Sequence, residues 1–539
     1  MVNDQMVNKK TIVFLTGATG TMGFAGMTEI LRYPERYELR ILARPSKKNK
    51  ELLEPLNLQH STLNIIWGDL TKYEDVLQGV TGADIVLHVG GMVSPQADYR
   101  PKATFRTNIT AAENVTRAIL AQPKERQPKV VYVGSVAQMG DRREPLHWGR
   151  AGDPICISAY DHYGLTKALA ERIITDSGIH QWVSLRQSGI LYPAILRNYD
   201  PIMFHVPIRG VLEWATVEDS GRLLERVCRT EVPEAFWNNY YNIGSGPEYR
   251  LSNYEFECLL LDAIGCPKPE KIFNANWFTT RNFHGMWYID GDKLEDYLHF
   301  RANVPVKDYF AQMAQAPSLP WGIKFAAKTH IAKLFPHCVK LAMRKMANSP
   351  EHGTQWWVRK VKGERTLRYR TAQAPTDERL KAKEELRIAA YYGSMEAYEA
   401  IPDWKHMDLS HNSETPVLLD HGYDESKEVD QLTDAELQQA AAFRGGKYLG
   451  NDTWQDAEGH TFQAGRRLVL LGGHWSPYDL PFPYENFQFS IVNCQLSTTP
   501  WHWDRVAKKN PFFAQLWAPL HEPDEDNIYG PEIFEGWEK

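Results

Sequence analysis

The segment Thr11–Gly23, with the sequence TIVFLTGATGTMG, decides the fold of this chain. Its first five residues form a continuous apolar run, which is typical of a strand buried in a parallel sheet. Gly17 then permits a tight turn, Gly20 lets the backbone approach a pyrophosphate, and Gly23 lets the next helix pack close to the sheet. The N-terminus of that helix points at the negative charge. The segment therefore predicts a nucleotide-binding unit made of a strand, a glycine turn and a helix.

The rest of the N-terminal half alternates strands and helices, as a doubly wound sheet requires. This alternation predicts an α/β fold with a Rossmann-type doubly wound parallel sheet. Strands are expected near 11–15, 38–43, 63–67, 84–89, 129–134 and 182–186, and the helices between them include 22–32 and 108–121.

A second motif places Tyr163 four residues before Lys167. Residues four apart are stacked neighbours on one helix face, so the ammonium can stabilise the phenolate and lower the pKa of the tyrosine toward that of a general acid or base. The spacing also occurs on surface helices that have no catalytic role. It becomes informative only beside the glycine turn.

The glycine turn, Ser135 and the Tyr163/Lys167 pair together resemble the extended, epimerase/dehydratase-like branch of the short-chain dehydrogenase/reductase superfamily. The resemblance covers about residues 10–300 and implies a Rossmann core with a small substrate-binding subdomain. Two residues depart from the family pattern, since Gln187 stands where the family usually has Pro and Tyr192 where it has Gly. Further segments that resemble motifs of the family occur in the expected order: Gly68–Leu70, His88–Gly91, Thr107–Asn108 and Leu185–Pro193.

The resemblance implies a role for each catalytic residue. Tyr163 would donate a proton to the substrate oxygen, and Ser135 would hold that oxygen by a hydrogen bond. Lys167 would lower the Tyr163 pKa and bind the nicotinamide ribose, and Asn108 would hold a water or the backbone near Lys167. The residues expected to bind the cofactor are Gly17, Thr19, Gly20, Thr21, Met22, Gly23, Arg44, Asp69, Leu70, Val89, Gly90, Tyr163, Lys167, Gln187 and Ser188.

The end of the second strand indicates which nicotinamide cofactor binds. An NAD enzyme normally places an Asp or Glu there to contact the ribose hydroxyls, but this chain has Arg44 followed by Lys47 and Lys48. A guanidinium can bind a 2′-phosphate through paired charge-assisted hydrogen bonds and can stack on adenine. NADP(H) is therefore favoured over NAD, and the alternative is that these cations form only a solvated loop.

Composition excludes several other classes of protein. The formal charge of −6 gives no sign of nucleic-acid binding, and the six cysteines are scattered without a CxxC pair that would indicate zinc or a disulfide framework. The sequence has no uninterrupted apolar run long enough to span a bilayer, and the residues after Met1 contain no apolar h-region of the kind found in secretory leaders. We expect a cytoplasmic homo-oligomer that binds a small-molecule substrate and neither a nucleic acid nor a metal.

Three regions are expected: the dehydrogenase-like domain at 1–310, a helical or irregular connector at 311–430, and an aromatic-rich C-terminal α+β module at 431–539. Within the connector, residues 321–345 mix bulky apolar side chains with Lys and His. Such a basic amphipathic stretch could lie on a membrane surface. We favour instead a connector whose apolar side packs on its own protein.

The C-terminal module begins with Thr433–Glu436, a capping box that predicts a helix ending at Gly445. The following sequence weakly resembles a treble-clef zinc module. However, Asp456, Ser476 and Asp479 stand where thiolates would be, and a structural zinc site loses most of its binding energy without soft ligands. We expect a metal-free relic.

These features predict an NADP-dependent oxidoreductase that interconverts a carbonyl and a secondary alcohol. The apolar, aromatic region around 199–214 is expected to hold a bulky substrate, steroid-like or polyphenol-like. His205, His284 and Trp287 could line that pocket, although packing inside the protein or a surface position is favoured for each. One alternative is a nucleotide-sugar epimerase or dehydratase. The other is an NADP-binding sensor or scaffold without turnover, against which the retention of Ser135, Tyr163 and Lys167 counts.

Overall fold

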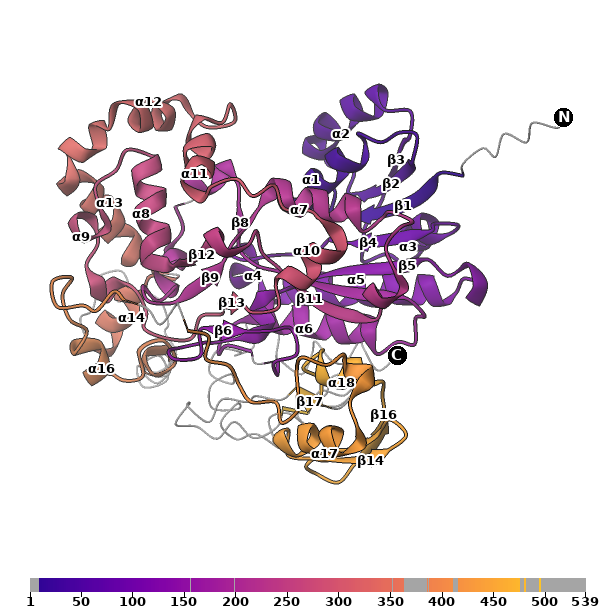
Figure 1. Ribbon diagram of the computed structural model, residues 1–539. Coiled ribbons are helices and arrows are strands. Elements are labelled where there is room, and N and C mark those ends of the chain that lie inside the picture. Colours follow the sequence, from indigo (N-terminus) through magenta and orange to yellow (C-terminus); the bar gives the residue numbers. More distant parts are fainter. Residues whose placement is uncertain are drawn as a thin grey trace, which may run out of the picture.

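The computed structural model describes residues 9–155, 157–197, 199–350, 352–362, 385, 387–410 and 415–475, together with the backbone of 479–480 and 494–495. A seven-stranded sheet with all neighbours parallel forms its centre, in the order β11-β7-β5-β4-β1-β2-β3 (Figure 1). This confirms the predicted Rossmann-type fold. The strands are β1 (Thr11–Thr16), β2 (Tyr37–Ala43), β3 (Leu63–Trp67), β4 (Ile85–His88), β5 (Lys129–Ser135), β7 (Trp182–Gln187) and β11 (Asn239–Ile243).

Helices cover both faces of this sheet because its strands alternate their apolar side chains between two cores. Phe14 of β1 packs with α3, α5 and α6, whereas Val13 and Leu15 pack with α1, α2, α7 and α10 on the other face. The helices are α1 (Thr21–Ile30), α2 (Lys47–Gln59), α3 (Tyr73–Val80), α4 (Gln96–Tyr99), α5 (Pro101–Leu120), α6 (His162–Thr175), α7 (Val217–Arg226) and α10 (Asp292–Leu298).

A second lobe of helices follows, on the left of Figure 1. Its apolar core runs from Leu191 to Ala347, so the residues on either side of position 310 share one core. The domain boundaries at 310 and 430 stay predictions. The helices of this lobe are α8 (Asn253–Ala263), α9 (Pro269–Ile272), α11 (Val306–Gln315), α12 (Trp321–Thr329) and α13 (Pro336–Ala347). The helices α14 (Thr354–Val361) and α16 (Met395–Glu399) follow, and their buried side chains join the core that contains Phe14.

Short strand pairs join the two lobes. Each strand in these pairs has only two or three residues. The pairs therefore hold the connecting segments in place but do not extend the central sheet. The pairs are β6 (Trp148–Gly149) with β13 (Trp287–Tyr288), β8 (Ile190–Leu191) with β10 (Ala215–Thr216), and β9 (Val211–Glu213) with β12 (Arg250–Ser252).

The C-terminal module lies below the sheet in Figure 1 and starts with the predicted capping box. The Thr433 backbone N–H donates to Glu436 Oε2 at 2.9 Å, and the Glu436 N–H donates to Thr433 Oγ1 at 3.4 Å. The predicted helix is therefore confirmed. The elements are α17 (Asp434–Phe443), β14 (Lys447–Gly450), β15 (Thr453–Gln455), β16 (Thr461–Gln463) and α18 (Arg466–Leu470), followed by β17 (Asp479–Leu480) paired with β18 (Cys494–Gln495).

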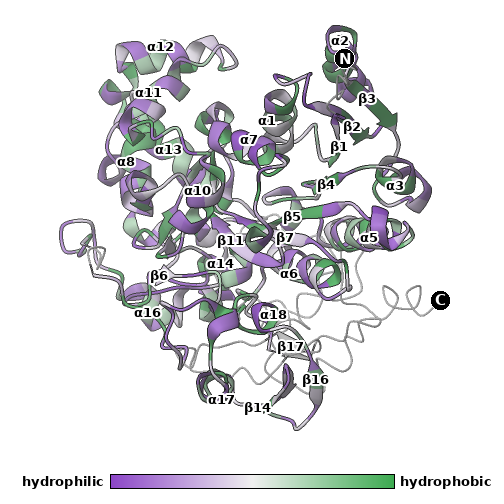
Figure 2. Cartoon of the chain, turned by 45° about the vertical axis from the view of Figure 1, so that its right-hand side comes forward, coloured by the Kyte–Doolittle hydropathy of each residue, from purple (hydrophilic) through white to green (hydrophobic). Residues whose placement is uncertain are grey.

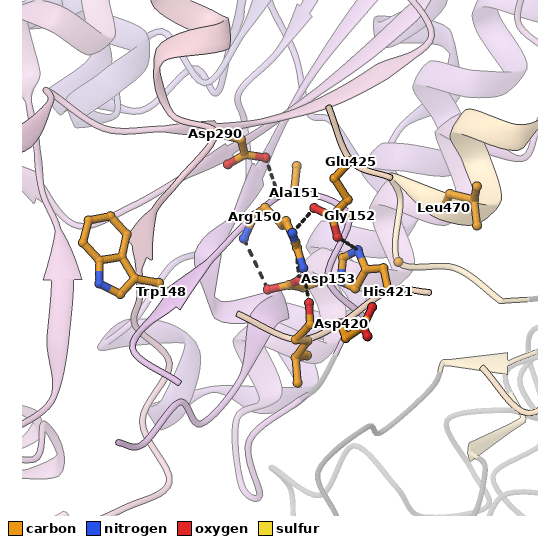
Figure 3. A network of polar contacts seen from close by, with 12 residues as sticks. Trp148, Arg150, Ala151, Gly152, Asp153, Asp290, Asp420, His421, Glu425 and Leu470 are labelled. Carbon is orange, nitrogen blue, oxygen red and sulfur yellow. Dashed lines mark hydrogen bonds and ion pairs between the residues drawn. The ribbon is translucent and has the colours of Figure 1, made fainter. Parts of the chain in front are cut away.

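Polar contacts attach the C-terminal segment to the Rossmann domain (Figure 3). His421 Nε2 lies 2.7 Å from Asp153 Oδ1, and Arg150 pairs with Glu425. In addition, Arg444 Nη2 donates to the Gly152 carbonyl at 2.9 Å. Asp153 is fully buried, and its pKa is lowered because the charges of Arg142, His421 and Arg150 outweigh the effect of burial, which raises it. The attachment thus uses buried ionised groups.

In this structure, residues of the zinc-like sequence make contacts that do not involve a metal. Asp456 Oδ1 accepts the backbone N–H groups of Glu458 and His460, so this carboxylate closes a turn. His474 points away from it, toward Glu171 at 3.4 Å and Asp176 at 3.5 Å on α6. Among the described residues there is no cluster of three potential metal ligands. Ser476 lies outside the described residues, and only the backbone of Asp479 is described, so the absence of metal stays a prediction.

We expect Trp475→Ala to destabilise the protein by about 3 to 5 kcal/mol, because it empties a buried site. Trp475 is 3% exposed and packs edge-on against Trp454 and Phe462. Urea unfolding measures the loss, and Trp321→Ala, at a side chain 74% exposed, is the matched control.

Metal analysis of the purified protein should find no stoichiometric zinc, and a chelator should leave Tm unchanged. One tightly held zinc per chain would contradict this interpretation.

Candidate functional site

The glycine turn has the close contacts that its sequence predicts. Gly17 has φ +78°, and a Cβ added there would lie 2.7 Å from Gly90 Cα. A Cβ on Gly23 would lie 2.2 Å from the Gly17 carbonyl oxygen, so α1 can begin this close to β1 only with glycine at that position. Gly20 is exposed and precedes α1, and no described side chain caps that helix. Its N-terminal N–H groups therefore suit an anionic phosphate.

The residues predicted to surround the nucleotide gather at the carboxyl ends of β1 and β4, where the strand order reverses. A Cβ on Gly90 would lie 2.7 Å from Leu70 Cδ1 and 3.1 Å from the Gly17 nitrogen, which brings three predicted positions together. Thr16 Oγ1 accepts the Gly90 N–H at 3.0 Å and lies 2.9 Å from His88 Nδ1. Burial lowers the pKa of His88 to about 3, so its ring is neutral.

Arg44 extends from the end of β2 and is exposed, as are Lys47 and Lys48 in the first turn of α2. Burial raises the pKa of Asp69, but hydrogen bonds from Thr71 and the positive charge of Arg44 outweigh it, and the pKa is lowered. Arg44 and Asp69 thus lie near each other, and their contacts with a nucleotide stay predictions.

Ser135 and Tyr163 meet at the end of β5. Ser135 is the last residue of that strand, Tyr163 lies in the first turn of α6, and their hydroxyl groups share a hydrogen bond. Burial raises the pKa of Tyr163 to about 12, and the carboxyl groups of Asp161 and Asp98 add to the rise, while the Ser135 bond opposes it. The phenol is therefore protonated near neutral pH.

Lys167 differs from its predicted arrangement. Its Nζ donates to the Val133 carbonyl at 2.5 Å and lies 4.5 Å from the centre of the Tyr132 ring. Burial lowers the pKa of Lys167 to about 7, although the nearby Glu171 opposes this shift. The expected depression of the Tyr163 pKa is not found, because the ammonium is directed into the β5 backbone rather than at the phenol.

Asn108 lies on α5 and links two parts of the site. Its Nδ2 donates to Thr166 Oγ1 at 2.9 Å and to the Met92 carbonyl at 3.1 Å, and its Oδ1 accepts the Met92 N–H at 2.7 Å. It therefore holds the loop after β4 against α6, one residue before Lys167. Asn108 thus has a positioning role, which agrees with the expectation that it would hold the backbone near Lys167 rather than a water.

Gln187 and Ser188 are buried at the end of β7, where Gln187 is the register partner of Ser135. Gln187 Oε1 accepts from Ser220 Oγ at 3.2 Å, and its Nε2 donates to the Ser188 carbonyl at 3.2 Å. The departure from the family's Pro thus supplies a hydrogen-bonded side chain beside Ser135.

A cavity of about 900 Å³ lies between the sheet and the helical lobe. One end is polar and includes Asp98, Asp161 and His284, two of which influence Tyr163. The remaining wall is largely apolar and is built by residues of α8, α12 and α13 together with Tyr192, the second departure from the family pattern. His205 also lines the cavity. Trp287 is instead packed against Trp148, with ring centres 5.6 Å apart.

Two carboxyl groups in this cavity were not predicted from the sequence. Burial and then the charge of Asp161 raise the pKa of Asp98 to about 7, and burial alone raises that of Glu257 to about 8. Asp98 Oδ2 and Glu257 Oε2 have no hydrogen-bond partner among the described residues. Asp98 could have been suspected, because it follows β4 at the edge of the sheet where ligands bind. Glu257 carried no such signal.

The comparisons with known proteins concern mainly the N-terminal third. Residues 13–186 match the model of the NAD dependent epimerase/dehydratase family. The chain is 31% identical over 115 residues to UDP-glucose 4-epimerase of Rickettsia typhi (21% of this chain, 33% of that protein). It is 27% identical over 177 residues to human 3 beta-hydroxysteroid dehydrogenase type 7 (32% and 46%). The chain thus spans about a third to a half of the length of these relatives.

The crystal structure of the Bordetella bronchiseptica enzyme WbmG in complex with NAD and UDP is also similar, with a TM-score of 0.46 and 18% identity. It covers 58% of this chain and 97% of that one. Nothing in the comparisons supports a zinc module in residues 431–539. The match to the NAD dependent epimerase/dehydratase family thus covers residues 13–186, the part of the chain that carries the glycine turn, Ser135, Tyr163 and Lys167.

Proposed function

We propose that this protein is an NADP-dependent oxidoreductase that interconverts a carbonyl and a secondary alcohol on a bulky, uncharged, largely apolar substrate. Two observations support the proposal: the hydrogen-bonded Ser135–Tyr163 pair, and a mostly apolar cavity of about 900 Å³ whose lining includes Asp161, two residues before Tyr163. A cavity of this size suits a ligand with several fused rings.

The residues present fit a nicotinamide nucleotide. The N-terminus of α1 and the glycines at 17, 20 and 23 would hold its pyrophosphate, and Arg44 would bind a 2′-phosphate. When bound, the cofactor supplies or accepts a hydride. Tyr163, protonated at neutral pH, gives its proton to the substrate oxygen in the reducing direction, and Ser135 holds that oxygen. Lys167 fixes the β5 backbone beneath them through the Val133 carbonyl.

The alternative is a nucleotide-sugar epimerase or dehydratase, the activity named for several relatives. A sugar nucleotide carries a diphosphate, which binding sites usually neutralise with Arg or Lys. The described residues that line the cavity include no Arg or Lys but do include the carboxyl groups of Asp98, Asp161, Asp200 and Glu257. The cavity therefore favours an uncharged substrate, such as the 3β-hydroxysteroids named for another relative.

Cofactor and substrate choice test the proposal together. With a panel of ring ketones and alcohols, NADPH should be used in preference to NADH by about tenfold or more, since a charged hydrogen bond contributes about 1.5–3 kcal/mol. Arg44→Asp should erase or reverse that preference, read by absorbance and by nucleotide titration. Lys124→Asp is the matched control, because this exposed cation precedes β5 and so lies at the amino ends of the strands, whereas Arg44 follows the carboxyl end of β2.

Equal affinities for the two nucleotides in the unmodified protein would contradict the NADP assignment. Conversion of UDP-sugars with no turnover of any ketone or alcohol would establish the alternative function. Nucleotide binding without turnover of either substrate class would favour a sensor or scaffold.

A further inference from the structure

The outer rim of the helical lobe exposes an unusual number of large apolar side chains. This rim consists of α12, the short 3-10 helix η8 (Ile331–Leu334) and α13, at the upper left in Figure 1. Trp321 is 74% exposed, Leu334 75% and Leu341 63%. Of the thirteen exposed large hydrophobic residues in the described part of the chain, six lie here: Trp321, Phe325, Ile331, Leu334, Phe335 and Leu341.

The rim is also strongly basic. Residues 316–350 contain no Asp or Glu, although the whole chain has a formal charge of −6. The lysine Lys333 makes one ion pair, 3.1 Å to Asp262 on the end of α8. Figure 2 shows hydrophilic and hydrophobic residues along α12 at the edge of the molecule. The cations of this segment are Lys324, Lys328, Lys333, Lys340, Arg344 and Lys345.

This combination fits an anionic lipid surface better than a second copy of the chain. Interfacial helices place Trp, Phe and Leu among acyl chains and Lys and Arg at the headgroups. A symmetric dimer through the same rim would bring two identical basic surfaces together, which like-charge repulsion opposes. Trp321 and Phe325 stack with ring centres 5.0 Å apart, so they form one continuous apolar face one turn apart on α12.

The rim and the cavity share the same helices. Ile323 and Ala326 of α12 and Val339, Met343 and Met346 of α13 line the cavity, while the neighbouring residues of both helices face solvent. No helix in the described part of the chain has both the length and the hydrophobicity needed to cross a bilayer. The two helices therefore suit attachment to one face of a membrane, with the cavity directly behind them.

We propose that α12, η8 and α13 dock on the surface of a bilayer that contains anionic lipids, with Trp321, Phe325, Leu334 and Phe335 entering the acyl-chain boundary. The docking stands independently of the catalytic activity. Its consequence for the enzyme, which rests on the proposed function, is that an apolar substrate dissolved in the membrane enters the cavity between α12 and α13 without crossing water.

Vesicle sedimentation with the full chain tests the docking. The protein should bind vesicles of phosphatidylcholine with about one third phosphatidylglycerol, bind pure phosphatidylcholine less, and lose affinity at about 1 M salt, where the Debye length is about 3 Å. Trp321→Ala with Leu334→Ala should weaken binding by about tenfold or more, because each side chain contributes roughly 1.5–3 kcal/mol when buried. Lys324→Gln with Lys328→Gln should weaken it by a similar factor, at about 1 kcal/mol per cation.

Leu58→Ala is the matched control, because Leu58 is exposed on α2 in the Rossmann domain. Far-UV circular dichroism and Tm should be unchanged in every variant, since all the altered side chains are largely exposed or half-buried. Equal sedimentation of the rim variants and the unmodified protein would overturn the proposal. Failure to bind vesicles, with self-association that the same variants abolish, would show that the rim joins two copies instead. Vesicle binding by a protein without ketone reductase activity would leave the docking intact and remove only the proposed function.

Discussion

Tyr163→Phe is expected to lower turnover by about two to four orders of magnitude, because it removes the proton that a general acid contributes. The ring remains, so nucleotide affinity should change little. The hydrogen bond to Ser135 is lost with the hydroxyl group, and the substrate oxygen then has one partner instead of two. Single-turnover assays with NADPH and the best ketone from the screen measure the change in the chemical step.

Tyr199→Phe is the matched control, since Tyr199 is a tyrosine that lines the cavity and belongs to neither β5 nor α6. Its turnover should stay within a few-fold of the unmodified enzyme, on the order expected for a group outside the reaction. A fully active Tyr163→Phe protein would show that another group carries the proton, and Asp98, whose pKa is raised to about 7 by burial and Asp161, would be the next candidate.

Glu171→Ala is expected to destabilise the protein by about 3 to 5 kcal/mol, the usual cost of leaving one partner of a buried ion pair alone. Glu171 and Arg186 are both fully buried, and the guanidinium donates to both carboxylate oxygens, at 2.8 and 3.0 Å. Arg186 also donates to the carbonyls of Ala151 and Gly472. The remaining cation could not be hydrated without opening the contact between β7 and the C-terminal module.

The pH dependence has a defined sign. Burial raises the pKa of Glu171, but Arg186 and His474 outweigh it, and the pKa is well below its usual range. The stabilisation is therefore present above the carboxyl pKa of the unfolded chain and is lost as the pH falls toward the lowered folded value. Urea unfolding of the unmodified protein and of Glu171→Ala should give free energies that converge on acidification.

The double variant Glu171→Leu with Arg186→Met should recover most of the lost stability, because two apolar side chains leave no buried charge without a partner. Lys9→Ala, which breaks an exposed pair 3.3 Å from Asp84, should cost less than about 1 kcal/mol. A loss for Glu171→Ala no larger than that of Lys9→Ala would mean that water reaches Arg186, and the description of a sealed ion pair would be wrong.

The sheet was predictable because its signals are local. Each strand is a short apolar run, and Gly17 and Gly23 have contacts that allow no other residue. Helix boundaries were less accurate: α5 begins at Pro101 rather than at residue 108, because proline at the first helical position favours an earlier start.

The candidate site was predictable where the residues follow β-strand ends and helix spacing. Ser135 and Tyr163 lie together as predicted. The direction of the Lys167 side chain was not predictable, because it is set by a hydrogen bond to the Val133 carbonyl, and the spacing of residues in the sequence does not reveal such a bond. The region around 199–214, predicted to hold the substrate, does line the cavity. The rest of the cavity could not be predicted, because Asp98, Glu257 and Met343 meet only through packing of elements far apart in the sequence. The carboxyl groups of Asp98 and Glu257 owe their raised pKa values to that burial.

The contact between Arg186 and Gly472 has a consequence for the division of this chain into parts. Gly472 supplies one of the carbonyls that accept from Arg186 of the central sheet. His474, from the same loop, lies against Glu171, one turn after Lys167 on α6. A fragment ending near residue 430 would keep the nucleotide-binding motif but expose this ion pair to water. The Rossmann domain of this protein is thus completed by Gly472 and its neighbours, which lie nearly three hundred positions after β7 in the sequence. The smallest part of the chain that folds by itself must therefore include these residues.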